Sequence, residues 1–162
     1  MKKILLAVCC MLLSLCLLAG CGETAIDENG VSAATLNGQT VVLGATLTDT
    51  LSAALGTPID TVEAVSCHYE GMDTIYEYDG FTLYTYQKEG AKIIYSIELL
   101  DAAYKTAEGA AVGMTKAAVQ ALYSTVSCEE IGSGLCYTYP NGQQLFFHMD
   151  GDTVNCIEYY TE

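Results

Sequence analysis

The segment 74–100 reads TIYEYDGFTLYTYQKEGAKIIYSIELL, and it decides the fold class. It is rich in Tyr, Ile, Thr and Phe, the residues that favour a pleated, half-buried surface. Asp79-Gly80 supplies the positive φ angles of a tight hairpin, and strands joined so tightly must be antiparallel. We therefore predict a meander of antiparallel strands at residues 74–79, 81–88 and 92–100.

The second half of the chain echoes the first. Three matches occur in the same order in both halves: Val65-Ser66-Cys67 with Val126-Ser127-Cys128, Tyr76 and Tyr78 with Tyr137 and Tyr139, and Ile97-Glu98 with Ile157-Glu158. Short β-rich segments also resemble each other through composition alone. The preserved order nevertheless favours an internal duplication, and repeats of this kind dictate architecture.

A short predicted helix precedes the strands of each half. Leu51 and Leu55 fall on one helical stripe in the first half, with Thr48 as the N-cap. In the second half Val119 lies on the corresponding stripe, and Thr115 is the N-cap. The remaining strands are predicted at residues 62–69, 125–130, 135–139, 143–150 and 153–160.

These elements predict an α+β fold of two tandem helix-plus-antiparallel-meander repeats. One helix cannot cover both faces of a separate sheet in each repeat. We therefore expect one continuous sheet with both helices on one face, and with the other face open to solvent or a partner. The connecting segment 101–112 fits either a helix or an extended crossover.

The N-terminal segment predicts export. Lys2 and Lys3 precede an apolar run over residues 4–19, which is shorter than the roughly 20 residues that a membrane-spanning helix needs. Small residues at 19 and 20 precede Cys21, whose thiol can be alkylated by a lipid. An ordinary cleaved signal followed by a chance cysteine is the alternative.

The tetrapeptide Leu18-Ala19-Gly20-Cys21, with its upstream segment, resembles the lipobox of exported bacterial lipoproteins. The resemblance implies cleavage after residue 20 and a diacylglycerol on Cys21. The mature protein would then be anchored by lipid to the cell membrane and face outside the cytoplasm. Residues 21–35 are small, polar and acidic, and predict a flexible tether, with a docked N-terminal piece as the alternative. The two repeats would occupy residues 36–100 and 101–162.

The helix-plus-meander pattern over residues 36–162 resembles the β-lactamase inhibitor protein fold. More loosely, it is similar to the small lipoprotein of the outer-membrane barrel assembly machinery. The stretch from Gly109 to Tyr123 is similar to the helix entry of such repeats. The resemblance implies that the open sheet face binds another protein, and no inhibitory loop residue carries over from that family.

Charge and motif content weigh against several functions. The chain has 20 Asp and Glu against 6 Lys, and its net charge of −14 would repel nucleic acid. It contains no Gly-x-Ser-x-Gly, His-Glu-x-x-His or P-loop motif. We predict no metal, no cofactor and no enzymatic activity, although a histidine-based catalytic group could still assemble in space around His68 or His148.

The cysteines downstream of Cys21 are Cys67, Cys128, Cys136 and Cys156. An even number outside the cytoplasm permits disulfides. Cys128 and Cys136 flank a glycine-containing turn and could face each other across a hairpin, so they are the candidate disulfide. Plain buried thiols are the alternative.

Tyrosine gives the most suggestive pattern, with 12 Tyr and no Trp in the chain. Spacing of two residues puts both members of a pair on one side of a strand. We predict an aromatic binding face formed by Tyr76, Tyr78, Tyr84, Tyr86, Tyr137 and Tyr139. The alternative is that these rings fill the core or form cross-strand ladders.

The function predicted from these features is that of a lipid-anchored extracytoplasmic protein. It would bind another protein on its aromatic sheet face without catalysing a reaction. The first alternative is an envelope-assembly or structural lipoprotein. The second is a hydrolase or a small-ligand carrier with a pocket between helices and sheet.

Overall fold

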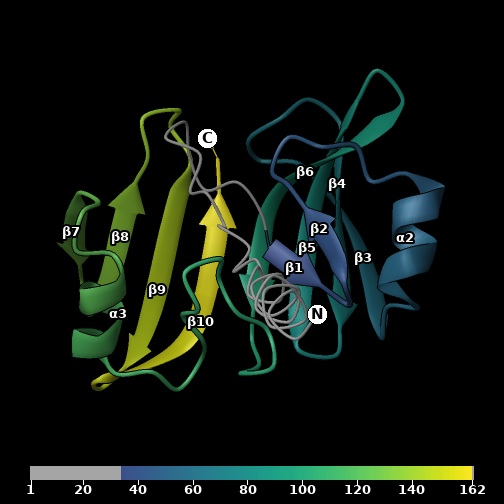
Figure 1. Ribbon diagram of the computed structural model, residues 1–162. Helices are drawn as coiled ribbons and strands as arrows, with labels where there is room; N and C mark the ends of the chain where they lie inside the picture. Colours follow the sequence, from purple (N-terminus) through teal and green to yellow (C-terminus); the bar gives the residue numbers. More distant parts are fainter. Residues whose placement is uncertain (1–33, 162) are drawn as a thin grey trace, which may run out of the picture.

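The computed structural model describes residues 34–161 of the chain, which are mostly β-structure. The predicted signal segment, Cys21 and most of the predicted tether lie outside these residues. Figure 1 shows that a large sheet, with short helices packed beside it, makes up most of this part of the chain. The elements in chain order are β1 (Ala34–Leu36), β2 (Gln39–Val41), α2 (Asp49–Leu55), β3 (Asp60–Val65), β4 (Met72–Tyr78), β5 (Phe81–Lys88), β6 (Ala91–Leu99), α3 (Lys116–Leu122), β7 (Cys128–Ile131), β8 (Gly134–Thr138), β9 (Gln144–Asp150) and β10 (Thr153–Tyr160).

The main sheet has eight strands in the order β3-β4-β5-β6-β10-β9-β8-β7, and all neighbours are antiparallel. In each half of the chain a helix precedes four strands of the main sheet, and in the first half the β1–β2 hairpin precedes the helix. The last strands of the two halves, β6 and β10, pair with each other at the centre of the sheet. The predicted single antiparallel sheet is therefore confirmed, and the predicted bounds of β5 and β10 are the observed ones.

Both helices begin at the predicted caps. The Thr48 hydroxyl accepts a hydrogen bond from the Leu51 amide at 3.2 Å, and the Thr115 hydroxyl accepts one from the Ala118 amide at 3.3 Å. These bonds satisfy amides that have no partner within the helix. Each helix has seven residues, so packing against the sheet, rather than intrinsic propensity, must hold it.

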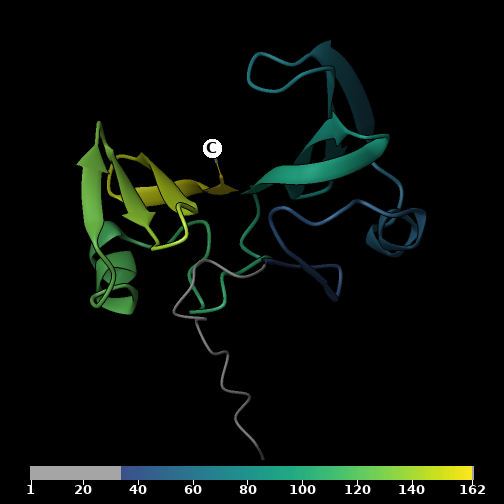
Figure 2. The same ribbon diagram turned by 90° about the horizontal axis from the view of Figure 1, so that it is seen from above.

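The helices pack on the same face of the sheet. Leu55 of α2 and Val119 of α3 belong to one buried core. The strand register places the core residues of the sheet in rows, and the clearest row runs Tyr78, Phe81, Leu99, Ile157, Phe147 and Leu135. Figure 2 shows both helices and the β1–β2 hairpin on one side of the sheet, which leaves the opposite face uncovered. We call that opposite surface the open face.

The start of the described part of the chain and the segment that connects the two halves differ from their predictions. Ala34 and Thr35, placed at the end of the flexible tether, lie in β1, where Ala34 is fully buried in the core. The connecting segment 101–112 is neither a helix nor a strand. It makes turns and one antiparallel bridge between Lys105 and Ala111.

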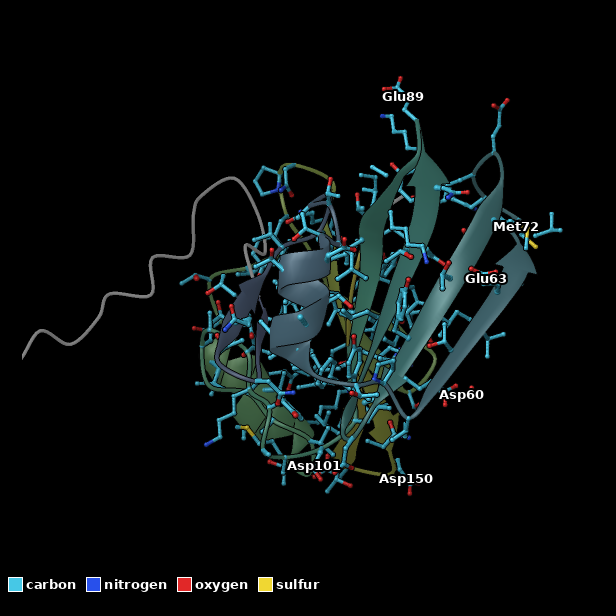
Figure 3. The ribbon with its side chains drawn as sticks, turned by 90° about the vertical axis from the view of Figure 1, so that its right-hand side faces the viewer. Asp60, Glu63, Met72, Glu89, Asp101 and Asp150 are labelled. Carbon is cyan, nitrogen blue, oxygen red and sulfur yellow. The ribbon has the colours of Figure 1, made fainter. Side chains whose placement is uncertain are left out.

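The edges of the sheet carry carboxylates. All six residues of β3 are exposed, and Figure 3 shows Asp60 and Glu63 along this edge with Met72 beside them. Charges on an edge strand oppose pairing with a second sheet. Among the described residues no helix is long and apolar enough to cross a membrane.

Candidate binding site on the open sheet face

The prediction that six tyrosines share the open face is wrong for four of them. Tyr76 and Tyr78 pair across the strands with Leu83 and Phe81, so they lie on the helix-covered face. Tyr78 is 5% exposed, and Tyr76 is partly buried against the core. The Lys92 ammonium donates a hydrogen bond to the Tyr76 hydroxyl.

The same correction holds in the second half. Tyr137 pairs with Leu145 on the helix-covered face, and its side chain is 1% exposed. Tyr139 is 5% exposed and belongs to the same core. These rings fill the space between helix and sheet, which was the alternative interpretation.

The length of the β4–β5 turn explains why Tyr76 and Tyr78 do not share a face with Tyr84 and Tyr86. The β4–β5 turn aligns Tyr78 with Phe81, so even-numbered residues of β4 face the same side as odd-numbered residues of β5. Tyr84 and Tyr86 therefore pair with Ile75 and Asp73, and lie on the open face. A shift of one residue in register moves a side chain to the other face.

Two tyrosines outside the predicted set of six join Tyr84 and Tyr86 on the open face. Tyr69 comes from the loop 66–71 and stacks on Tyr86, with ring centroids 3.8 Å apart. Tyr95 lies 5.4 Å from Tyr69 and 6.1 Å from Tyr84, centroid to centroid. We call Tyr69, Tyr84, Tyr86 and Tyr95 the tyrosine cluster.

Local backbone features place both added rings. The strand predicted over residues 62–69 ends at Val65, because the Ser66 hydroxyl accepts hydrogen bonds from the amides of His68 and Tyr69 and turns the chain. A β-bulge in β6 leaves Tyr95 between residues that pair with Tyr84 and Thr85. Bulges re-aim side chains in this way.

Carboxylates line the centre of the open face. Glu98 and Glu158 are directly opposite each other in the β6–β10 register. Like charges in such a pair repel, and neighbouring donors offset the repulsion. The Tyr84 hydroxyl donates to Glu98 at 2.8 Å, and His148 Nε2 lies 3.0 Å from Glu158 Oε2.

The carboxylates on the open face, together with burial, raise the pKa of the neighbouring tyrosines. Burial and the Glu98 carboxylate raise the pKa of Tyr84. Burial and the nearby Asp73 carboxylate raise the pKa of Tyr95 to about 12. Both phenols are therefore neutral donors at physiological pH, and the surrounding field favours a cation.

Two adjacent hollows open beside the tyrosine cluster. The smaller has a volume of about 350 Å³, and its walls include His68, Tyr69, Asp73, Tyr95, Glu158 and Tyr160. The larger, about 830 Å³, is open to solvent and lies between Tyr69, Tyr86 and Lys88. Tyr69 lines both hollows. The smaller volume lies within the range of small-ligand sites.

The predicted disulfide between Cys128 and Cys136 is wrong. Cys128 pairs with Tyr137, and Cys136 pairs with Glu129, so the two thiols lie on opposite faces of the β7–β8 hairpin. A disulfide needs Cβ atoms about 3.5–4.5 Å apart, which this register does not permit. Cys67, Cys128, Cys136 and Cys156 are all free.

Cys156 pairs across the strands with His148 on the open face, and His148 contacts Glu158, so a thiol lies near a histidine–carboxylate pair. Burial, Glu98 and Glu158 raise the pKa of Cys156 to about 12. A nucleophilic cysteine needs a lowered pKa, so this arrangement disfavours thiol catalysis. Within residues 34–161 no group of three or more His, Cys, Asp or Glu could hold a metal ion.

The chain is similar in structure to a solved bacterial protein. This neighbour is a DUF4309 family protein (YjgB) from Bacillus subtilis, with a TM-score of 0.44 and 14% sequence identity over 78% of this chain and 85% of that one. No family model matches the sequence, and no curated protein matches it. At this level of similarity the neighbour carries no argument about the site.

Proposed function

We propose that this protein is an exported lipoprotein, held at the outer side of the cell membrane by a lipid on Cys21, that binds another protein on its open sheet face. The basic, apolar and small-residue order of segment 1–21 supports the anchor. Two acyl chains on one residue suffice for stable attachment. The binding role is supported by the tyrosine cluster and its adjoining hollows.

The tyrosine cluster is the observation that carries the binding role. Its four rings are half-buried rather than sealed in the core, although each is large and mostly apolar. Tyrosine gives wide contact area with little loss of conformational freedom, and it is enriched at interfaces. Rings gathered beside a hollow on the uncovered face are suited to receive a partner.

Charge complementarity points to the kind of partner. Glu77, Glu98, Glu158 and Glu129 lie on the same face as the cluster, because each belongs to one row of the strand register. Lys88 borders only the larger hollow. A protein segment that carries basic side chains would be steered to this surface.

We also propose that the two halves arose by duplication, as in the β-lactamase inhibitor protein fold that the sequence resembles. The element order supports this, since a helix and four strands occur in each half. The register supports it as well. Ile97-Glu98 and Ile157-Glu158 meet at the centre with Glu98 opposite Glu158, as an approximate two-fold axis through that pair requires.

Site-specific photo-crosslinking on intact cells tests the binding role. A photoreactive benzoylphenylalanine replaces Tyr86 in one variant and Gln120, an exposed residue of α3, in the matched control. We expect a specific adduct at position 86 and none at position 120. The cross-linked peptide should contain Lys or Arg, and added salt should weaken adduct formation.

The same experiment separates the alternatives. An adduct with a multiprotein envelope complex would indicate an assembly role, and adducts of equal yield at both positions would contradict the open-face proposal. The anchor has its own test. Cys21→Ser should release the protein from the membrane fraction and abolish palmitate labelling, whereas a variant that stays at the membrane would refute lipidation.

A further inference from the structure

The smaller hollow on the open face has an unusual chemical lining. It lies between the loop 66–71 and the strands β6 and β10, and it combines the rings of Tyr69 and Tyr95 with the carboxylates of Asp73 and Glu158. The Tyr69 hydroxyl donates a long hydrogen bond of 3.5 Å to the Thr161 carbonyl, so the loop reaches across the hollow to the end of β10. The hollow is therefore bounded by residues from both halves of the chain.

Asp73, in the wall of this hollow, has a carboxylate oxygen without a hydrogen-bond partner. Its Oδ1 atom is buried without a hydrogen-bond donor, and its Oδ2 atom accepts only a long hydrogen bond of 3.5 Å from the Tyr95 hydroxyl. Among the described residues, the ion pairs join Lys116 to Glu130 and His148 to Glu158. No cationic side chain among the described residues pairs with the Asp73 carboxylate, and an acceptor atom buried without a partner is costly.

Aromatic rings beside a carboxylate with no cationic partner among the described residues are suited to an organic cation. Ring faces attract ammonium groups, and the attraction grows when water is excluded. We propose that this hollow binds one primary ammonium group, presented as a lysine side chain of the partner protein. The inference rests on the proposed function, since it names the chemical group by which the partner is recognised.

Lysine fits the site better than arginine does. A guanidinium group is recognised best by two parallel acceptor oxygens. The Asp73 carboxylate does not offer such a pair, because Oδ1 is buried and Oδ2 faces the Tyr95 hydroxyl. An ammonium group acts as a compact point charge and needs only proximity to the carboxylate and the rings.

The test titrates the full-length chain in detergent micelles with n-butylammonium as a mimic of the lysine side chain. Butanol serves as the neutral isostere and n-butylguanidinium as the arginine mimic. With ¹³C-labelled tyrosine, the resonances of Tyr69 and Tyr95 should shift saturably with butylammonium and not with butanol. Butylguanidinium should bind more weakly, and equal or tighter binding would overturn the choice of lysine.

Variants locate the binding. Asp73→Asn should raise the Kd for butylammonium about tenfold or more, as expected for loss of one interaction with a charged group. Asp152→Asn removes the same charge from an exposed turn and should leave the Kd unchanged. Tyr95→Leu keeps the carboxylate, removes a ring and should also weaken binding, so the test does not depend on the folding of one variant.

Failure of this inference is distinguishable from failure of the proposed function. If butylammonium causes no saturable shift, or if Asp73→Asn binds as tightly as the wild type, the ammonium site is wrong. A cross-link at position 86 would still support a protein-binding face in that case. If butylammonium binds and no cross-link forms, the ammonium site is supported and the proposal of a protein partner is contradicted.

Discussion

Replacement of Tyr137 by alanine should destabilise the protein strongly, because the structure places this ring in the core. Its side chain is 1% exposed and packs against Tyr123 and Phe147, with ring centroids 4.8 Å and 5.8 Å away. Truncation of a buried large aromatic residue to alanine costs about 3–5 kcal/mol through lost transfer energy and a residual cavity. That is a large part of the roughly 5–15 kcal/mol that stabilises a typical domain.

Urea denaturation followed by far-ultraviolet circular dichroism measures the effect. With a denaturant slope of about 2 kcal/mol/M, Tyr137→Ala should lower the unfolding midpoint by about 2 M. Tyr86→Ala is the matched control on the open face. It removes one stacked pair with Tyr69 and should cost only about 1 kcal/mol. Equal shifts for the two variants, or no shift for Tyr137→Ala, would refute the assignment of the two faces.

Three further predictions follow from packing and ionisation. Gly134→Ala should lower the free energy of unfolding by about 1–3 kcal/mol, because the new Cβ would lie 2.5 Å from Phe146 Cε1. An unchanged denaturation midpoint would contradict this prediction. Cys156 should be alkylated by iodoacetamide at pH 8 far more slowly than exposed Cys67, since its pKa of about 12 leaves little thiolate. Comparable alkylation rates, measured by mass spectrometry, would show that Cys156 is not shielded. Folding raises the pKa of Tyr95 from 10.0 to about 12. The neutral phenol therefore contributes its full stabilisation below pH 10, and this contribution is lost as the pH rises to about 12. Denaturation midpoints that stay constant between pH 10 and 12 would argue against a buried Tyr95 beside Asp73.

The sequence was sufficient for most strands of the main sheet and for the helix caps because those signals are local, but the strand predicted over residues 62–69 spans Asp60–Val65 instead. Alternating side chains and turn dipeptides gave the bounds of β5 and β10, and Thr48 and Thr115 are the observed N-caps. Strands β1 and β2 were missed because each has three residues and they form a separate two-stranded sheet with each other. Their burial depends on the core beneath them, which no local pattern reveals.

The binding site was only half predictable. The β4–β5 turn puts even-numbered residues of β4 and odd-numbered residues of β5 on one face, so Tyr78 and Tyr84 lie on opposite faces of the sheet. This alternation can be counted from the sequence once the turn is placed. The positions of Tyr69 and Tyr95 depend on the turn at Ser66 and on the bulge in β6, which are set by tertiary pairing. A hairpin register also decides that Cys128 and Cys136 face opposite sides.

Oxidative footprinting of tyrosines tests most directly whether the open face is occupied in the cell. Hydroxyl radicals generated in intact cells and in the purified full-length protein should modify Tyr104, which hydrogen-bonds Asn37 away from the open face, at equal rates. Tyr86 should be oxidised more slowly in cells than in the purified protein, because a bound partner covers it. Equal oxidation of Tyr86 in the two preparations would contradict the account.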